Sequence, residues 1–404
     1  MRVVHVSAYF PPAFRYGGPP ASVLGLCQGL QRAGVDVEVV TTTANGDAPL
    51  PASPPEGTEY DGVPVRYAAA AFPRRFFGAR VRGPLAEALG RADICHIHGI
   101  WNVPEWWASH LARTRRVPYV VSPRGMLQPA AIRRGEWRKA VAYRLLEERN
   151  LRRASVLHAT SNQEADAIRD LHLDVPVAVV PNGVDVAAAD AAMPGYGARL
   201  GIPPDAFVVL FLGRMHRIKR LDILADAFSI VRGAHGSTHL ILAGPDDHGH
   251  LASIMRRLTP HAGFVHAIDA LGEDDKWALL ADADASVQCS DSESFGLAVV
   301  EAMAAAVPVV VTRTCPWPEI EARGCGFWVD QSAAASCRVA ARGFSCSRPP
   351  STARMGSRSF RARPLPRSSS TPVWMASRSG RSRARTARAC PRPGFGRRTA
   401  AARA

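Results

Sequence analysis

The chain has 404 residues, of which 47% are hydrophobic and 21% are charged, enough to build two domains with buried cores. No apolar run reaches the roughly 18 residues that a membrane-spanning helix needs. The first residues enter a strand without a signal-peptide pattern, so we expect a cytoplasmic protein. The eight cysteines are scattered without paired spacing, which argues against a disulfide framework or a zinc site.

The net charge of +15 comes from the C-terminal segment. Seventeen arginines and no Asp, Glu or Lys follow Asp330, which leaves 33 basic and 35 acidic side chains in residues 1–330. From about Ser332 the sequence is rich in Arg, Ser, Ala and Pro and predicts no packed element. Residues 333–404 therefore read as a disordered polycation or, as we prefer, as the product of a frameshift that replaced the native C-terminus.

The N-terminal part begins with a predicted strand and helix. Val3–Ala8 alternates as a strand does, and Ala21–Ala33 has the apolar spacing of a helix. Gly17 and Gly18 lie in the loop between them. Paired glycines let a diphosphate approach the backbone and the helix N-terminus, although a plain tight turn is the better explanation of the glycine pair alone.

Further strands are predicted at 35–43, 93–98, 117–122, 156–160 and 177–180, with an exposed loop at 44–62 and a helix at 161–171. Together these elements form a first doubly wound domain. His96 and His98 share one face of their strand, but no third metal ligand is evident, so we expect no metal there. His98 lies at the strand's C-terminal end, where parallel sheets bind ligands, and is a candidate for contact with a sugar or acceptor.

A basic helix is predicted at residues 130–153, where eight Arg and Lys side chains are interspersed with Trp137, Tyr143 and Leu145. One interpretation is a solvated helix face. The other is contact with anionic phospholipid of the inner membrane, or with a lipid-diphosphate acceptor. The helix that follows begins at Ser161, which has the pattern of an N-cap with Glu164 three residues later.

The second domain starts with an unbroken apolar strand at 207–213. Arg214 and Lys219 follow it, and an Arg fork with a mobile Lys charge suits a diphosphate, although surface charge is the alternative. The Asp- and His-rich segment 244–250 reads as a strand-to-helix turn rather than a metal site.

The segment Ser290–Thr312 predicts a polar turn, a helix opening near Phe295 and a strand after Pro308. Glu293 would precede the helix, and Glu301 would lie about two turns inside it, near the backbone N–H groups at Gly296. A helix N-terminus attracts phosphate, and a carboxylate accepts hydrogen bonds from sugar hydroxyls. An ordinary strand-loop-helix unit remains the simpler interpretation.

Glu293 and Glu301, with Phe295-Gly296 and the run Glu-Ala-Met-Ala followed by Pro-Val-Val, resemble the E-x7-E signature of the retaining GT-B glycosyltransferases of family 4. The resemblance implies an α/β fold of two doubly wound, Rossmann-like domains facing across a cleft, with boundaries at 1–187 and 201–332 and a linker at 188–200. It also implies transfer of a sugar from a UDP or GDP sugar to a saccharide or lipid-linked acceptor in exopolysaccharide synthesis. Neither metal nor cofactor is expected.

The resemblance also assigns roles to residues. Glu293 would contact the transferred sugar and Glu301 the nucleotide ribose. The implied donor site consists of Gly17, Gly18, Arg214, Lys219, Ser294, Phe295, Gly296, Leu297 and Glu301. Arg124 stands in a loop where the family commonly has a His, so we expect Arg124 to contact a phosphate or an anionic acceptor. Glu293, His98 and Arg124 are the expected catalytic residues.

Three further features follow from the comparison with family 4. Asn182 and Gly183 match the segment that closes its N-terminal domain. Ser294 and Ala306 stand where glycine is common, so we expect local strain there. Asp282 and Asp284 resemble a metal-binding D-x-D motif, which we discount because the order of elements is that of the metal-independent fold.

Two rival hypotheses from other classes remain. A polyanion-binding protein acting through its basic tail would bind nucleic acid in a salt-sensitive way, although we do not expect nucleic acid as a partner of the first 332 residues. A catalytically impaired transferase, damaged by its altered C-terminus, would show a folded or aggregating chain without turnover.

Overall fold

The computed structural model describes residues 1–46, 48–50, 58–70, 79–129 and 143–333. These residues belong to one compact unit of the chain. The predicted tail, apart from Ala333, and the first half of the predicted basic helix lie outside the described residues.

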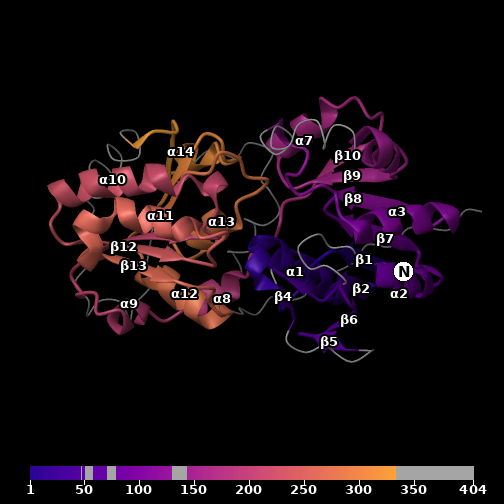
Figure 1. Cartoon of the computed structure of the whole chain (residues 1–404), viewed down its shortest axis with the longest axis horizontal. Helices are drawn as coiled ribbons and strands as arrows, with labels where there is room; N and C mark the ends of the chain where they lie inside the picture. The colour runs from indigo at the N-terminus through magenta and orange to yellow at the C-terminus, as the bar shows by residue number, and fades with distance from the viewer. Residues whose placement is uncertain (47, 51–57, 71–78, 130–142, 334–404) are drawn as a thin grey trace, which may run out of the picture. The chain divides into compact units, whose positions relative to one another are not determined.

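The first domain contains a sheet of eight strands in the order β10-β9-β8-β7-β1-β2-β6-β5 (Figure 1). Its strands are β1 (Arg2–Ser7), β2 (Asp36–Thr42), β5 (Glu59–Tyr60), β6 (Val63–Ala68), β7 (Ile94–His98), β8 (Tyr119–Ser122), β9 (Val156–Ala159) and β10 (Val177–Val179). All neighbours are parallel except β5 and β6, which are antiparallel. The segment predicted as a loop at 44–62 holds β5 and a small hairpin of β3 (Ala44–Asn45) and β4 (Ala48–Pro49).

The helices of this domain join consecutive strands. They are η1 (Phe14–Tyr16), α1 (Gly18–Arg32), η3 (Ala79–Val81), α2 (Arg82–Leu89), α3 (Val103–Thr114), η4 (Tyr143–Glu147), α6 (Glu148–Arg152) and α7 (Asn162–Arg169). The predicted N-cap of α7 is confirmed, because Ser161 Oγ accepts a hydrogen bond of 3.2 Å from the backbone N–H of Glu164.

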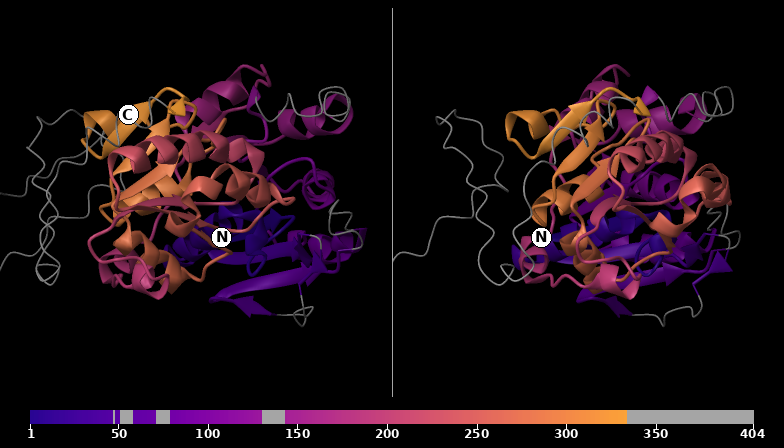
Figure 2. Two further views of the ribbon diagram at one scale, coloured as in Figure 1. Left: turned by 60° about the vertical axis from the view of Figure 1, so that its left-hand side comes forward. Right: turned by 90° about the vertical axis from the view of Figure 1, so that its left-hand side faces the viewer.

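The second domain contains six parallel strands in the order β13-β12-β11-β14-β15-β16. They are β11 (Phe207–Leu212), β12 (Thr238–Ala243), β13 (Val265–Ile268), β14 (Ala285–Gln288), β15 (Val309–Thr312) and β16 (Gly326–Val329). Alternate residues of β11 serve two cores: Val208 and Leu210 face one cluster, while Val209 and Phe211 face the other. The sheet is therefore covered by helices on both faces, as an unbroken apolar strand requires (Figure 2).

The helices of the second domain divide between these two cores. Those on the Val209 and Phe211 side are α10 (Leu221–Ala234) and α11 (His250–Arg257), and those on the other side are α12 (Glu273–Asp282) and α13 (Leu297–Ala304). Three short elements complete the domain: η5 (Arg217–Lys219), η6 (Thr259–Phe264) and α14 (Glu319–Ala322).

The segment between the two sheets is more ordered than the sequence suggested. It forms α8 (Val186–Ala191) and α9 (Tyr196–Arg199), and Val184 and Ala188 pack against the core of the second domain. Asp282 accepts hydrogen bonds of 3.0 and 2.7 Å from the backbone N–H groups of Gly195 and Gly197. One carboxylate of the D-x-D pattern therefore anchors this segment.

No helix in the described part of the chain is long and apolar enough to cross a membrane.

Two glycines allow the ends of β11 and β12 to lie against each other. Gly213 has φ +150° and Gly244 has φ +138°, and a Cβ atom on Gly244 would lie 2.2 Å from the carbonyl oxygen of Gly213. No side chain fits there, so the turn that carries Arg214 depends on Gly244.

We expect Gly244→Ala to lower the free energy of unfolding by about 3 kcal/mol or more, because both φ and the backbone contact exclude a methyl group. Urea unfolding followed by circular dichroism measures this loss. Gly263→Ala is the matched control, since its Cβ would meet nothing within 4 Å. Equal stability of the two variants would contradict the close contact.

Candidate active site

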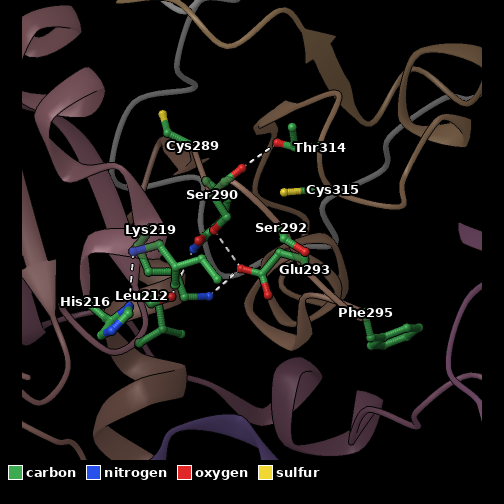
Figure 3. Close-up of polar contacts among 12 residues, drawn as sticks. Leu212, His216, Lys219, Cys289, Ser290, Ser292, Glu293, Phe295, Thr314 and Cys315 are labelled. Carbon is green, nitrogen blue, oxygen red and sulfur yellow. Dashed lines mark hydrogen bonds and ion pairs between the residues drawn. The ribbon is translucent and has the colours of Figure 1, made fainter. Parts of the chain in front are cut away.

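The loop that carries Glu293 joins β14 to α13 and is held by hydrogen bonds from the next strand. The carbonyl oxygen of Ser290 accepts from the hydroxyl groups of Thr312, at 3.2 Å, and Thr314. Ser290 Oγ in turn donates to Glu293 Oε1 at 2.7 Å (Figure 3). The start of the loop and the orientation of the Glu293 carboxylate are thus fixed together.

Lys219 forms an ion pair with Glu293. Its Nζ contacts Glu293 Oε1, and both side chains are largely buried, at 18% and 14% exposed (Figure 3). The N–H of Lys219 also donates to the carbonyl oxygen of His216 at 2.8 Å, which closes the turn after β11. The loops after β11 and β14 therefore bring together Lys219, a predicted phosphate contact, and Glu293, a predicted sugar contact.

Arg214 lies at the same end of the sheet and also has a carboxylate partner. Its Nη1 is 3.0 Å from Asp247 Oδ2, in the turn between β12 and α11. A Cβ atom on Gly17 would lie 3.9 Å from Arg214 Cβ, and one on Gly18 would lie 3.0 Å from Leu297 Cδ1. The predicted donor residues of the first domain therefore lie beside those of the second.

The N-terminus of α1 has fewer free donors than an ordinary helix start. Gly17 caps the helix with φ +78°, but Pro19 and Pro20 have no N–H group. Gly18 and Ala21 keep their N–H groups within the first turn. The helix dipole still favours an anion here, with fewer hydrogen bonds to give.

Glu301 is paired with a lysine that the sequence analysis did not select. Lys276 Nζ, on α12, lies 2.8 Å from Glu301 Oε1 and 2.7 Å from Glu273 Oε2. Lys276 and Glu301 are 13% and 15% exposed, whereas Glu273 is 63% exposed. The spacing from Glu273 to Lys276 predicts their helical pair, but the contact with Glu301 depends on how α12 and α13 pack.

The backbone of the Glu293 loop also contacts the first domain. Gln128 donates through Nε2 to the carbonyl oxygen of Glu293 at 2.9 Å and accepts from Ser292 Oγ. Thr160 Oγ1 donates to the carbonyl oxygen of Ser294 at 3.1 Å. Gln128 and Thr160 were missed by the sequence analysis, because no local pattern indicates a contact across more than 130 residues.

Glu164 ties the two contact points of the first domain to each other. Its carboxylate accepts from the backbone N–H of Gly125 and, through Oε2, from the N–H and hydroxyl of Thr160 at 2.8 and 2.6 Å. Because Glu164 is almost fully buried, these three donors are what make its burial tolerable. The sequence predicted Glu164 only as part of a helix cap.

Arg124 is held by neutral groups. Its guanidinium donates to Ser22 Oγ at 2.8 Å and contacts His98 Nδ1 at 3.0 Å, and its Nε atom is buried without a partner among the described residues. Burial, partly offset by the more distant Glu164, lowers the pKa of Arg124 to about 10, so it stays cationic at neutral pH. Such a charge is available to an anion.

A third imidazole lies beside His96 and His98, contrary to the sequence analysis, which saw no further ligand. Nitrogen atoms of His5, His96 and His98 lie within 4.8 Å of one another, close enough to reach one cation. However, His5 Nδ1 and His98 Nε2 lie 2.9 Å apart and share a hydrogen bond, while the Arg124 guanidinium contacts His98. We therefore interpret the cluster as hydrogen-bonded imidazoles under a guanidinium that repels a metal ion.

The hydrogen-bonded histidines belong to a polar layer that continues across the sheet. His96 Nε2 lies 2.8 Å from Ser122 Oγ, which lies 2.6 Å from His158 Nδ1, and His158 Nε2 bonds the carbonyl oxygen of Val180 at 2.8 Å. Burial lowers the pKa of His5 to about 3, with a smaller effect from Arg124. Burial also lowers the pKa values of His96, His98 and His158, so all four imidazoles are neutral at pH 7.

Glu105 is a buried carboxyl group that the sequence analysis missed. Its Oε1 accepts from the backbone N–H of Ala8 at 2.9 Å, and its Oε2 has no partner among the described residues. Burial raises the pKa of Glu105 to about 8, so the group is mostly protonated at neutral pH and costs less to bury. It fixes the first residue after β1, where the loop toward Gly17 begins.

The other predicted site residues have plain structural positions. Phe295 is buried against Trp317, with ring centroids 5.1 Å apart, so only its backbone could reach a ligand. Gly296 caps α13 with φ +80°. Asn182 and Gly183 lie between β10 and α8. Ala306 has φ +58°, the strained conformation expected where the family commonly has glycine.

Part of the predicted basic surface is described. Arg144, Arg149, Arg152 and Arg153 line a surface pocket of about 520 Å³ together with Glu148. Arg152 is 3.0 Å from Glu148, so part of its charge is compensated locally. The pocket lies on η4 and α6, at the end of the predicted basic segment.

Comparisons with known proteins agree with this geometry. Residues 17–183 match the family described as a glycosyl transferase 4-like domain, and residues 196–344 match the glycosyl transferases group 1 family. D-inositol 3-phosphate glycosyltransferase 2 of Catenulispora acidiphila is 30% identical over 345 residues, covering 77% of each chain. The chain belongs to glycosyltransferase family 4.

A second relative has a similar name. D-inositol 3-phosphate glycosyltransferase of Kineococcus radiotolerans is 30% identical over 328 residues, and the alignment covers 73% of this chain and 72% of the relative.

Solved structures show that the transferase has the GT-B fold. Sucrose-phosphate synthase from Thermosynechococcus elongatus superposes with a TM-score of 0.66 at 18% identity, over 84% of this chain and 89% of the other. WaaG, a glycosyltransferase involved in lipopolysaccharide biosynthesis, gives 0.63 at 17% identity, over 84% and 89%. The predicted fold class and family are therefore confirmed.

We expect the buried imidazoles of the transferase to make its stability depend on pH. Because their pKa values are lowered, the unfolded chain binds more protons, and stability is lost as pH falls below about 6.5. Between pH 6.5 and 5.5 each such histidine should cost about 1 kcal/mol. His5→Gln should reduce the loss by that amount, measured by urea unfolding at the two pH values.

The control for this experiment is His248→Gln, because the His248 side chain is 83% exposed. It should keep the wild-type pH dependence. If His5→Gln and His248→Gln lose the same unfolding free energy between pH 6.5 and 5.5, the conclusion that the buried histidines are neutral is wrong.

Proposed function

We propose that this chain transfers a sugar from a nucleotide diphosphate sugar to an acceptor hydroxyl with retention of configuration and without a metal ion. The observation that carries this proposal is the buried pair of Lys219 and Glu293 beside Arg214 and Gly17. A mobile cation next to a carboxylate suits a site that must hold a leaving diphosphate and orient a sugar at once.

In this mechanism the bond between the anomeric carbon and the diphosphate oxygen breaks as the acceptor oxygen bonds to the same face of that carbon. The leaving phosphate takes the acceptor proton, so no separate base is needed. Arg214, Lys219 and the N-terminus of α13 would stabilise the charge that develops on the diphosphate. Glu293 would orient the sugar and is not assigned as a nucleophile.

A structural neighbour supports a UDP sugar as the first donor to test. Anabaena HepE, whose solved structure contains UDP-glucose, superposes with a TM-score of 0.61 at 17% identity, over 84% of this chain and 88% of the other. Thermal shift and calorimetry with UDP, GDP and ADP would identify the base. Absence of binding by all three would overturn the proposal.

Turnover with the identified donor should persist in EDTA, because fixed cations replace the metal ion in this mechanism. Product NMR would report the anomeric configuration. An inverted product, or activity that depends on added Mg²⁺ or Mn²⁺, would contradict the mechanism.

We expect Glu293→Gln to lower kcat roughly tenfold to a hundredfold, because one charge-assisted contact to the reacting sugar is lost. The nucleotide diphosphate alone should bind at least as tightly as it does to the wild type, because Lys219 no longer has a charged partner with which the diphosphate competes. Glu321→Gln is the matched control, since Glu321 is exposed on the short helix α14. Unchanged kcat in Glu293→Gln would remove Glu293 from the site.

We further propose that the acceptor carries an anionic group that Arg124 recognises. Arg124 has only neutral hydrogen-bond partners, and the relatives are named for a phosphorylated inositol. Arg124→Gln keeps a donor toward Ser22 but removes the charge. It should raise KM for D-inositol 3-phosphate, as probe, about tenfold or more, and leave turnover of uncharged myo-inositol unchanged.

A lipid-linked acceptor and peripheral contact with the inner membrane would fit the arginine pocket on η4 and α6. Sedimentation with vesicles of anionic phospholipid, compared with neutral vesicles, tests this contact. Binding that is lost in Arg149→Gln with Arg153→Gln would support it, and equal binding to both kinds of vesicle would oppose it.

A further inference from the structure

Lys276 has no role in the proposed reaction. It projects from the first turn of α12 to Glu301 on α13, and its Nζ also lies 5.0 Å from the centre of the Trp277 ring. Burial by itself would lower the pKa of Lys276, but Glu301 and Glu273 together raise it above the usual value. The ammonium group is therefore a permanent charge beside Glu301.

The contact uses one oxygen of Glu301. Lys276 approaches Oε1 at 2.8 Å, and no described residue bonds Oε2. A carboxylate has about four lone-pair positions, so Glu301 keeps room for two hydroxyl donors. The two side chains are 13% and 15% exposed, so the contact is largely shielded from solvent.

We propose that Lys276 is the positioning residue that holds Glu301 toward the ribose hydroxyls of the donor nucleotide. This inference rests on the proposed function. Lys276 fixes the rotamer of Glu301 through Oε1 and leaves Oε2 for the ligand. Glu273, the exposed partner, contacts the same ammonium group.

The experiment compares the affinities of UDP and 2′,3′-dideoxy-UDP by calorimetry. Wild type should bind UDP at least about tenfold more tightly, because only UDP donates hydrogen bonds to the carboxylate. In Lys276→Met this preference should fall about tenfold, because the Glu301 carboxylate loses the partner that fixes its orientation. A merely structural lysine would weaken the binding of both nucleotides alike and leave the preference unchanged.

Two variants serve as controls. Glu273→Gln removes the exposed partner of the same lysine and should keep the wild-type preference. Lys276→Arg retains the charge and should restore most of the preference. If Lys276→Met does not fold, as judged by its thermal unfolding, Lys276→Gln takes its place in the same comparison.

The outcomes separate the inference from the function on which it rests. No binding of UDP to wild type would overturn both. Binding and turnover without a preference for UDP over the dideoxy analogue would overturn the role of Glu301, and with it that of Lys276, but not the donor. A preference that Lys276→Met keeps in full would overturn the role of Lys276 alone.

Discussion

Three cations of the candidate donor site are paired with carboxylates before any substrate arrives. Lys219 contacts Glu293, Arg214 contacts Asp247, and Lys276 contacts Glu301. Lys219 and Lys276 are 18% and 13% exposed, so their pairing follows from burial, because an isolated ammonium group in a low dielectric is costly. Arg214 is 36% exposed, so burial requires its partner less strongly. A diphosphate that enters must therefore exchange ion pairs rather than meet free charges. The gain lies in geometry: the side chains are already fixed, so less rotamer entropy is lost when the ligand binds.

Arg124, in the first domain, has no carboxylate in direct contact among the described residues. Its hydrogen-bond partners, Ser22 and His98, carry no charge, and the histidines around it are neutral because burial and the guanidinium both oppose their protonation. The layer thus keeps one positive charge at the carboxyl ends of β7 and β8 without a counter-ion in direct contact. That asymmetry distinguishes the two halves of the site. One half holds balanced pairs, and the other holds a charge that an anion can still neutralise.

The sequence predicted features that depend on neighbouring residues and missed contacts between residues that are far apart along the chain. Glu293, Gly296 and Glu301 belong to one strand-loop-helix unit, so their spacing alone placed Glu293 before the helix and Glu301 within it. The same holds for Ser161 as a helix cap. By contrast, His5 joins His96 and His98 only because β1 pairs with β7, and Lys276 meets Glu301 only through helix packing. No periodicity indicates such contacts. Gln128 was missed for the same reason, since its partner lies 165 residues away.

The two departures from the family's glycine pattern have different physical consequences. Ala306 takes a left-handed conformation at φ +58°, so it stores strain at the end of α13, away from the Glu293 loop. Ser294 does not have a positive φ, and it packs against Gly125 of the first domain, on which a Cβ atom would lie 3.0 Å from Ser294 Cβ. The missing side chain of Gly125 leaves room for that of Ser294. The hydrogen bond from Thr160 to the Ser294 carbonyl oxygen survives, since it involves the backbone alone. Neither substitution therefore removes a group that the proposed reaction needs.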